Sequence, residues 1–137
     1  MSTVQHLKKN VFRGFHFQSK NKQAKFVNVI KGKILDIVID LRKGSKTFGK
    51  THSIILSEQN ALSLFIPAGF AHAYYSYYNE NIIYYKLDNY YNPKFEDGII
   101  YSDPEINLRL PKLSVKISKK DKNLLTLSQF KKKYKYL

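Results

Sequence analysis

The stretch "IPAGFAHAYY", residues 66–75, decides the fold. Pro67 and Gly69 are turn-forming residues, and a run rich in Ala, Phe and Tyr follows them directly. Proline fixes φ and glycine accepts conformations closed to other residues, so this P-x-G-x-x-H pattern predicts a tight corner that runs into a strand. His72 lies at the start of that strand and points to one of its faces.

Runs of the same kind surround this stretch. Each is short and rich in Val, Ile, Phe or Tyr, which predicts β-strands, and Gly, Asn and Ser turns separate them. The predicted strands are "NVFRGFHF" (10–17), "AKFVNVIKG" (24–32), "KILDIVIDL" (33–41), "HSIILS" (52–57), "LSLFIP" (62–67), "AHAYYSYY" (71–78) and "NIIYYKLDNYY" (81–91). Short turns without intervening helices favour an all-β antiparallel sandwich or barrel.

The last third of the chain predicts loops and one short helix. Prolines interrupt residues 92–117, which favours loops. The sequence "SKKD" (118–121) is typical of a helix start, with Ser118 as N-cap and Asp121 near the third helical position. Apolar residues then recur at helical spacing, at Leu124, Leu127 and Phe130.

The bulk composition favours a single globular domain over residues 1–137. Hydrophobic residues make up 43% of the chain and aromatic residues 15%. No apolar run approaches the roughly 20 residues of a membrane helix, so we expect no membrane partner. The start "MSTVQHLKKN" lacks the apolar region of a signal peptide, and cysteine is absent, which excludes disulfides and thiolate chemistry. We therefore expect a cytoplasmic protein.

The formal net charge of +14 suggests an anionic partner. Nucleic acid is disfavoured, because arginine occurs only at Arg13, Arg42 and Arg109, and lysine lacks the fork that favours Arg at base edges and phosphates. The lysines are also scattered, apart from the terminal "KKKYKYL". A lysine-rich solvated surface or an anionic small-molecule substrate explains the charge, and we expect no nucleic-acid partner.

The stretch at 66–75 resembles the second half of the cupin signature. The first half of that signature usually supplies an H-x-H pair for a metal, but here "GFHFQ" (14–18) contains His16 alone. Two histidines without a clear third ligand make a poor metal site. We therefore predict a metal-free cupin, a double-stranded β-helix or jelly-roll barrel, with a short C-terminal helix.

The surroundings of His16 favour chemistry over packing. A lone histidine on a strand is more often a satisfied core residue, but Arg13, Gln18 and Lys25 lie close to it in sequence. Alternation along a strand places His16 and Gln18 on one face and Arg13 on the other. A bulge at Gly14 would be needed for Arg13 to join His16.

Five successive blocks resemble the dTDP-4-dehydrorhamnose 3,5-epimerase family, cupins of nucleotide-sugar metabolism. They are "FRGFHFQ" (12–18), the block at 23–50, "IPAGFAHAYY" (66–75), "YYKLDNYYNPKFEDGI" (84–99) and "SDPEINLRLP" (102–111). The resemblance covers about residues 10–121 in unbroken order. It implies a cofactor-independent epimerase that inverts C3, C5 or both in a nucleotide-linked 4-keto-6-deoxy sugar, most simply a dTDP sugar, and a homodimer.

The resemblance also implies roles for individual residues. His16 would be the catalytic base, Asp121 its orienting partner, Lys25 the residue near the C4 oxygen, and Tyr85 the acid on the opposite sugar face. The implied substrate-binding residues are Arg13, Gln18, Asp36, His72, Tyr91 and Glu96. Plainer alternatives stay open from the residues alone: Tyr85 as packing, Asp121 as a helix cap, Lys25 as an exposed lysine and Asp36 facing solvent.

Two further interpretations and one departure accompany this prediction. A sugar-nucleotide 3,4-ketoisomerase is also a cupin, but its histidine-rich block is absent here. A non-catalytic sugar-nucleotide-binding cupin is the alternative from another class. Family members carry an upstream segment that clamps the nucleotide base across the dimer, and we expect this chain to be a short form without that segment.

Overall fold

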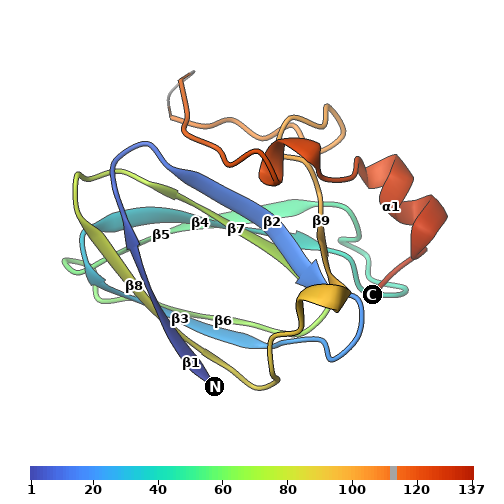
Figure 1. The fold of residues 1–137 in the computed structure, drawn as a ribbon, viewed down its shortest axis with the longest axis horizontal. Coiled ribbons are helices and arrows are strands. Elements are labelled where there is room, and N and C mark those ends of the chain that lie inside the picture. Colours follow the sequence, from blue (N-terminus) through green and yellow to red (C-terminus); the bar gives the residue numbers. More distant parts are fainter. Residues whose placement is uncertain (112–113) are drawn as a thin grey trace.

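The computed structural model describes residues 1–111 and 114–137. Over these residues, nine strands form two antiparallel sheets that face each other (Figure 1). One sheet has the order β1-β8-β3-β6 and the other the order β5-β4-β7-β2-β9. The strands are β1 (Ser2–Leu7), β2 (Phe12–Gln18), β3 (Lys25–Lys31), β4 (Lys33–Asp40), β5 (Thr51–Ser57), β6 (Ser63–Ile66), β7 (Phe70–Ser76), β8 (Asn81–Leu87) and β9 (Glu96–Gly98).

Two hydrophobic layers hold these sheets in place. The first lies between the sheets and includes Val27, Ile34, Leu56 and Ile83. The second lies on the outer face of the five-stranded sheet, where the segment after β9 and helix α1 (Leu127–Lys133) cover it (Figure 1). Strand β4 is therefore buried on both faces, and alternate residues of this strand point into different layers.

The seven predicted strands are all present, and two further strands were not predicted. The alternating polar sequence of β1 gave no hydrophobic run, yet β1 pairs with β8 along its whole length. Strand β9 has only three residues and pairs with β2. Residues 92–117 are otherwise loop-rich as predicted, with residues 112 and 113 of that range outside the described residues.

The prediction of where the C-terminal helix begins was wrong. Ser118 Oγ does accept a hydrogen bond from the Asp121 N–H (3.1 Å), but this closes a single 3-10 turn, η2 (Asp121–Asn123). Helix α1 is capped instead by Thr126, which forms a reciprocal capping box with Gln129. Tertiary contacts decide between the two caps, because Leu127 and Phe130 are buried in the outer layer.

The described residues contain no helix that is long and apolar enough to cross a membrane.

Candidate active site

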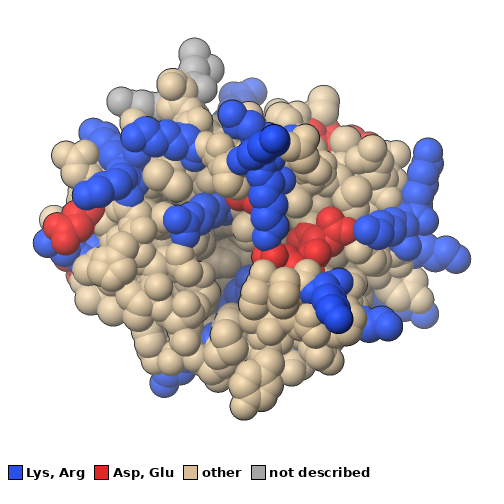
Figure 2. Space-filling model, in the orientation of Figure 1, with Lys and Arg blue, Asp and Glu red and all other residues tan. Residues whose placement is uncertain are grey.

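A cavity of about 320 Å³ opens between the two sheets, and most of the predicted site residues line it. The hollow lies in the middle of the face shown in Figure 2, with basic and acidic side chains at its rim. Eight of the ten predicted residues are in its wall: Arg13, His16, Gln18, Lys25, His72, Tyr85, Tyr91 and Glu96. Asp36 and Asp121 stand behind the wall, each bonded to one of its histidines.

A bulge in β2 brings Arg13 and His16 to the same cavity, as the strand alternation required. The pairing register of β2 with β7 shifts between these two residues. Gly14 lies at the shift with φ of +124°, and a Cβ atom there would come within 2.5 Å of Ala73 Cβ and the His72 carbonyl oxygen. Only glycine fits this close approach, so the bulge requires glycine at position 14.

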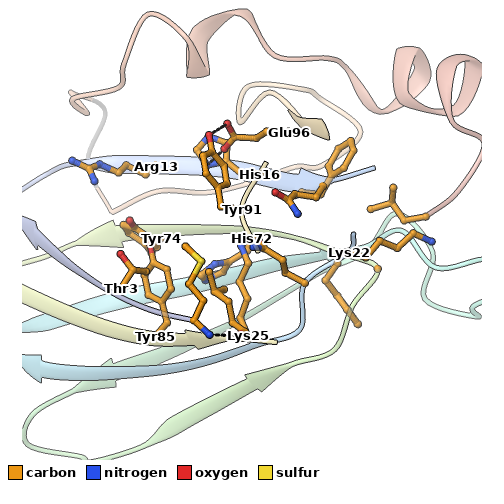
Figure 3. Close-up of a pocket in the computed structure, with 18 of the residues that line it drawn as sticks. Thr3, Arg13, His16, Lys22, Lys25, His72, Tyr74, Tyr85, Tyr91 and Glu96 are labelled. Carbon is orange, nitrogen blue, oxygen red and sulfur yellow. Dashed lines mark hydrogen bonds and ion pairs between the residues drawn. The ribbon is translucent and has the colours of Figure 1, made fainter. Parts of the chain in front are cut away.

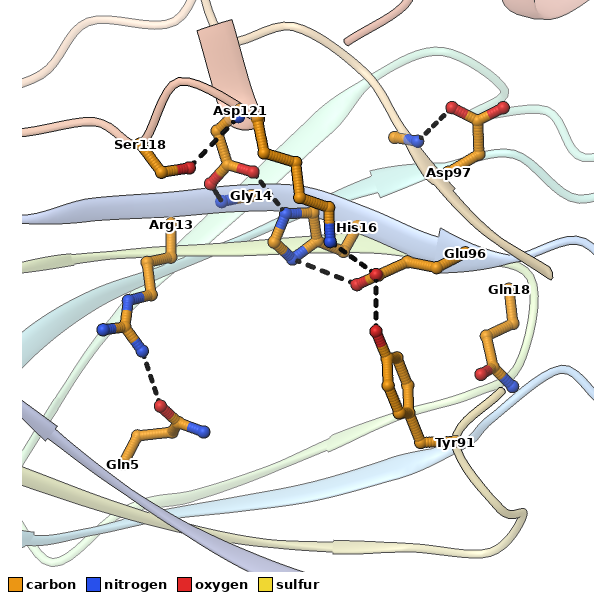
Figure 4. Close-up of polar contacts among 12 residues, drawn as sticks. Gln5, Arg13, Gly14, His16, Gln18, Tyr91, Glu96, Asp97, Ser118 and Asp121 are labelled. Carbon is orange, nitrogen blue, oxygen red and sulfur yellow. Dashed lines mark hydrogen bonds and ion pairs between the residues drawn. The ribbon is translucent and has the colours of Figure 1, made fainter. Parts of the chain in front are cut away.

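His16 is held by a buried carboxylate from the C-terminal segment. Asp121 Oδ1 lies 2.7 Å from His16 Nε2, and Asp121 Oδ2 accepts the Gly14 N–H at 3.0 Å (Figure 4). Burial raises the pKa of Asp121, but the hydrogen bonds from His16 and Gly14 outweigh it and leave that pKa below its ordinary value. An ionised Asp121 can only accept, so Nε2 carries the ring hydrogen and Nδ1 is the free basic nitrogen of neutral His16.

A second carboxylate stands beside the free nitrogen of His16. Glu96 Oε1 lies 3.9 Å from His16 Nδ1, beyond hydrogen-bonding distance. The other oxygen, Oε2, accepts hydrogen bonds from Tyr91 (2.7 Å) and Lys120 (2.5 Å), as Figure 4 shows. Burial raises the pKa of Glu96, and these two donors bring it below its ordinary value, so Glu96 is a carboxylate at neutral pH.

His72 forms a second, fully buried pair with Asp36. His72 pairs directly with His16 across β7 and β2, and its Nε2 lies 2.8 Å from Asp36 Oδ2. Burial lowers the pKa of His72 despite the opposing effect of Asp36, so the imidazole is neutral and donates its hydrogen to the carboxylate. Asp36 Oδ1 is buried without a partner in the described structure. Asp36 therefore does not face solvent.

Lys25 and Tyr85 come from the opposite sheet and face the histidines across the cavity (Figure 3). Burial lowers the pKa of Lys25 to about 8, against the opposing effects of Asp36 and Glu96. Burial also raises the pKa of Tyr85, against the effects of Tyr74 and Arg13. At neutral pH the wall opposite His16 thus holds a lysine cation and a protonated phenol.

The sequence analysis missed several wall residues. Thr3 and Gln5 of β1 line the cavity, and Gln5 accepts a hydrogen bond from Arg13 (2.5 Å). Tyr74 lies two residues beyond His72, so the alternation of β7 already placed it on the same face. Lys120 was also missed. It lies outside the wall and donates a hydrogen bond to Glu96, a residue 24 positions away in the sequence.

Gln18 lines the cavity but uses its amide within the fold. Its Nε2 donates to the carbonyl oxygens of Asn21 (2.8 Å) and Tyr90 (3.2 Å), and its Oε1 accepts the Asn92 N–H at 2.7 Å. The side chain therefore ties together two loops at the cavity mouth. Among residues 1–111 and 114–137, no group of three His, Cys, Asp or Glu side chains is arranged to hold a metal ion.

The sequence matches the model of the family described as dTDP-4-dehydrorhamnose 3,5-epimerase over residues 2–129. The chain belongs to this family. The match starts earlier than the predicted residue 10, because β1 is part of the shared fold. The curated 3,5-epimerase of Methanothermobacter thermautotrophicus is 42% identical over 118 residues, which cover 84% of this chain and 64% of the relative.

Solved structures of the family share the fold. A Legionella pneumophila 3,5-epimerase in complex with dTDP-4-keto-L-rhamnose is 36% identical, with a TM-score of 0.90 over 93% of this chain and 69% of that one. A 3'-monoepimerase from Streptomyces bikiniensis in complex with dTDP-quinovose is 25% identical, with a TM-score of 0.90 over 96% and 68%. The fold is therefore the predicted cupin barrel, and the chain spans a little under two thirds of the length of the curated relative above.

Proposed function

We propose that this protein is a cofactor-independent epimerase of a nucleotide-linked 4-keto-6-deoxy sugar. The observation that carries the proposal is the placement of His16, oriented by Asp121, opposite Tyr85 across one cavity. Inversion at carbon needs a base on one side of the sugar ring and an acid on the other. Two facing sheets supply that arrangement.

The chemistry follows from the 4-keto group, which acidifies the C–H bonds at C3 and C5. The free Nδ1 of His16 takes the proton, and the C–H electrons move into an enolate whose oxygen Lys25 stabilises. Asp121 stabilises the resulting imidazolium. Tyr85 then delivers its proton to the carbon from the opposite face. The phenolate takes a proton from solvent and the His16 imidazolium releases its proton to solvent, which restores both groups.

The substrate class rests on the family and on the charge of the cavity. The relatives named above are dTDP-sugar epimerases, and the Legionella structure holds a dTDP-keto sugar. Arg13, Lys22 and Lys25 line the cavity and suit a diphosphate and an enolate oxygen. We therefore propose a dTDP-4-keto-6-deoxy sugar as the substrate and deoxysugar biosynthesis as the process.

Solvent exchange tests the function directly. The protein is incubated with the dTDP-4-keto-6-deoxy sugar in D2O, and the C3–H and C5–H signals are followed by NMR. We expect loss of signal at one or both positions together with formation of the inverted product. Exchange at both positions indicates a 3,5-epimerase, whereas exchange at C3 alone indicates a monoepimerase.

Two variants separate the proposed roles. His16→Ala should abolish exchange, and Tyr85→Phe should retain exchange at the abstracted position but slow inversion. A product whose carbonyl has moved to C3 would instead identify a 3,4-ketoisomerase. Ligand-dependent thermal stabilisation without any exchange would show that the chain only binds the nucleotide sugar.

A further inference from the structure

The arrangement around Glu96 points to a role beyond the predicted substrate binding. Its Oε2 is already occupied by Tyr91 and Lys120, and its Oε1 points at the free nitrogen of His16. A carboxylate at this place would repel the diphosphate of a nucleotide sugar. Its partners and its charge therefore favour an interaction with the protein's own base.

We propose that Glu96, held in place by Lys120 and Tyr91, is a positioning residue that sets the basicity of His16. The proposal rests on the epimerase function argued above. The two His16 nitrogens have different carboxylate neighbours. Asp121 is hydrogen-bonded to Nε2, and Glu96 Oε1 lies 3.9 Å from Nδ1.

The effect of Glu96 depends on whether His16 carries the substrate proton. When His16 is neutral with its hydrogen on Nε2, Nδ1 has no hydrogen to donate to Glu96, and the two atoms lie 3.9 Å apart in the structure. Once Nδ1 takes a proton from the sugar carbon, the new N–H can donate to Glu96 Oε1. The proton is then directed toward Glu96 and away from the carbon that lost it, which favours reprotonation by Tyr85 from the other face.

Lys120 moderates this effect. Its Nζ lies 2.5 Å from Glu96 Oε2 and offsets part of the carboxylate charge, while most of its side chain is exposed. Removing Lys120 should therefore strengthen the pull of Glu96 on the His16 proton, and removing the charge of Glu96 should abolish that pull. The two changes act in opposite directions.

Other groups around His16 stay constant in this comparison. They come from each element that packs against it or faces it: Asp121 from η2, His72 from β7, Arg13 on β2 itself, Lys25 from β3 and, through Glu96, Tyr91. Only Glu96 approaches Nδ1 from the described part of the chain within ion-pair distance.

The test compares Glu96→Gln and Lys120→Gln with the wild type by two readouts. The first is the acid limb of the pH profile of kcat/KM, which reports the essential base of the free enzyme. The second is the pH titration of the His16 ring signals by NMR in the substrate-free protein. Glu96→Gln should move both midpoints to lower pH by about 0.5 to 1 pH unit, and Lys120→Gln should move them to higher pH.

Lys119→Gln is the matched control, since it removes the same charge from the neighbouring residue, which has no ion pair or side-chain hydrogen bond in the described structure. It should leave both midpoints where they are. Shifts of the same sign in the Glu96 and Lys120 variants, or no shift in Glu96→Gln, would overturn the proposal. The NMR titration needs no substrate, so it decides the coupling even if the wild type fails the exchange test, which would overturn only the epimerase function.

Discussion

At the scale of single residues, the contact between His16 and Asp121 decides which ring nitrogen is basic. Asp121 Oδ2 accepts the Gly14 N–H, and Oδ1 faces His16 Nε2. An asparagine at 121 would keep its oxygen on Gly14 and turn its NH2 group toward His16. The ring would then adopt the opposite tautomer, with a hydrogen on the nitrogen that faces the cavity.

Asp121→Asn should therefore lower kcat by about 10²–10⁴-fold with little change in folding. The measurement is the exchange and inversion rate beside a thermal melt. Asp97→Asn is the control, because Asp97 bonds to Lys133 and Tyr134 and not to His16. Near wild-type rates in the Asp121 variant would exclude the proposed tautomer control.

Lys25 illustrates a conflict between activity and stability at one residue. Its pKa falls from 10.5 to about 8 because of burial, so below pH 8 the folded state holds a charge that the unfolded chain accommodates more easily. The unfolded chain binds more protons between about pH 8 and 10.5, so this penalty fades as pH rises through that range. Below pH 8 the penalty amounts to about 3 kcal/mol.

Lys25→Met should accordingly lose the epimerase activity while gaining up to about 3 kcal/mol of stability at pH 7, and less at pH 10. Urea denaturation at the two pH values measures this difference. Lys22→Met is the control for stability. Because Lys22 is exposed at the cavity mouth, its removal should leave the free energy of unfolding nearly unchanged. A variant that is less stable than the wild type at pH 7 would contradict this account of Lys25.

At the scale of elements, the bulge in β2 is the feature on which the site depends. Gly14→Ala would place a methyl group 2.5 Å from Ala73 Cβ and the His72 carbonyl oxygen, at φ of +124°. We expect a loss of about 2–4 kcal/mol in the free energy of unfolding. Gly44→Ala, at φ of +68° with open space around the added methyl, should lose only about 1 kcal/mol. The free energy of unfolding of both variants is measured by urea denaturation. Equal losses would show that the bulge at Gly14 is not tightly packed.

Strands proved more predictable than the contacts between distant segments. Runs such as β4 and β7 have strong hydrophobic patterns, and the alternation along them already separated the cavity face from the outer face. Strand β1 alternates polar residues with isolated apolar ones, so its sequence alone does not predict a strand. Pairing with β8 stabilises it. The start of α1 was mispredicted because two capping sequences follow each other and only burial distinguishes them.

In the candidate site, too, single residues were more predictable than the contacts between distant segments. His16, Lys25, His72 and Tyr85 could be named from the family resemblance, and the structure brings all four to one cavity. Their carboxylate partners are long-range contacts: Asp121 is 105 residues from His16, and Asp36 is 36 residues from His72. The pair of Asp36 and His72 depends on the register between β4 and β7, so it could not be derived from the sequence.

At the scale of the whole molecule, the two sheets differ in how their outer faces are covered. The C-terminal segment covers the five-stranded sheet (Figure 1). The outer face of β1-β8-β3-β6 carries exposed Val4, Phe26, Ile30 and Phe65. Phe26 and Phe65 are cross-strand neighbours. Lys86 is paired with Phe26 on this face, so exposed apolar side chains lie beside a cation that a second copy could cover or leave at the rim.

We predict that the homodimer forms through this face. Phe65→Glu should shift the protein from dimer to monomer in analytical ultracentrifugation, since it would bury a carboxylate against its own copy. Ile55→Glu changes an exposed side chain on the other sheet and should leave the dimer intact. A dimer that survives Phe65→Glu would place the interface elsewhere, and a wild-type monomer would exclude the homodimer.

The net charge of +14 makes a further prediction about encounter with the substrate. Arg13, Lys22 and Lys25 line the cavity, so the field at its mouth should attract a nucleotide diphosphate. Between roughly 0.01 M and 0.15 M salt the Debye length falls from about 30 Å to about 8 Å, and we expect kcat/KM to fall by about tenfold. Because the bound substrate is shielded from that ionic atmosphere, kcat should change little. Initial-rate measurements at several salt concentrations give both kcat and kcat/KM. A fall in kcat equal to that in kcat/KM would mean that salt acts on the chemical step. Electrostatic attraction of the substrate would then not explain why the chain carries so many surface lysines.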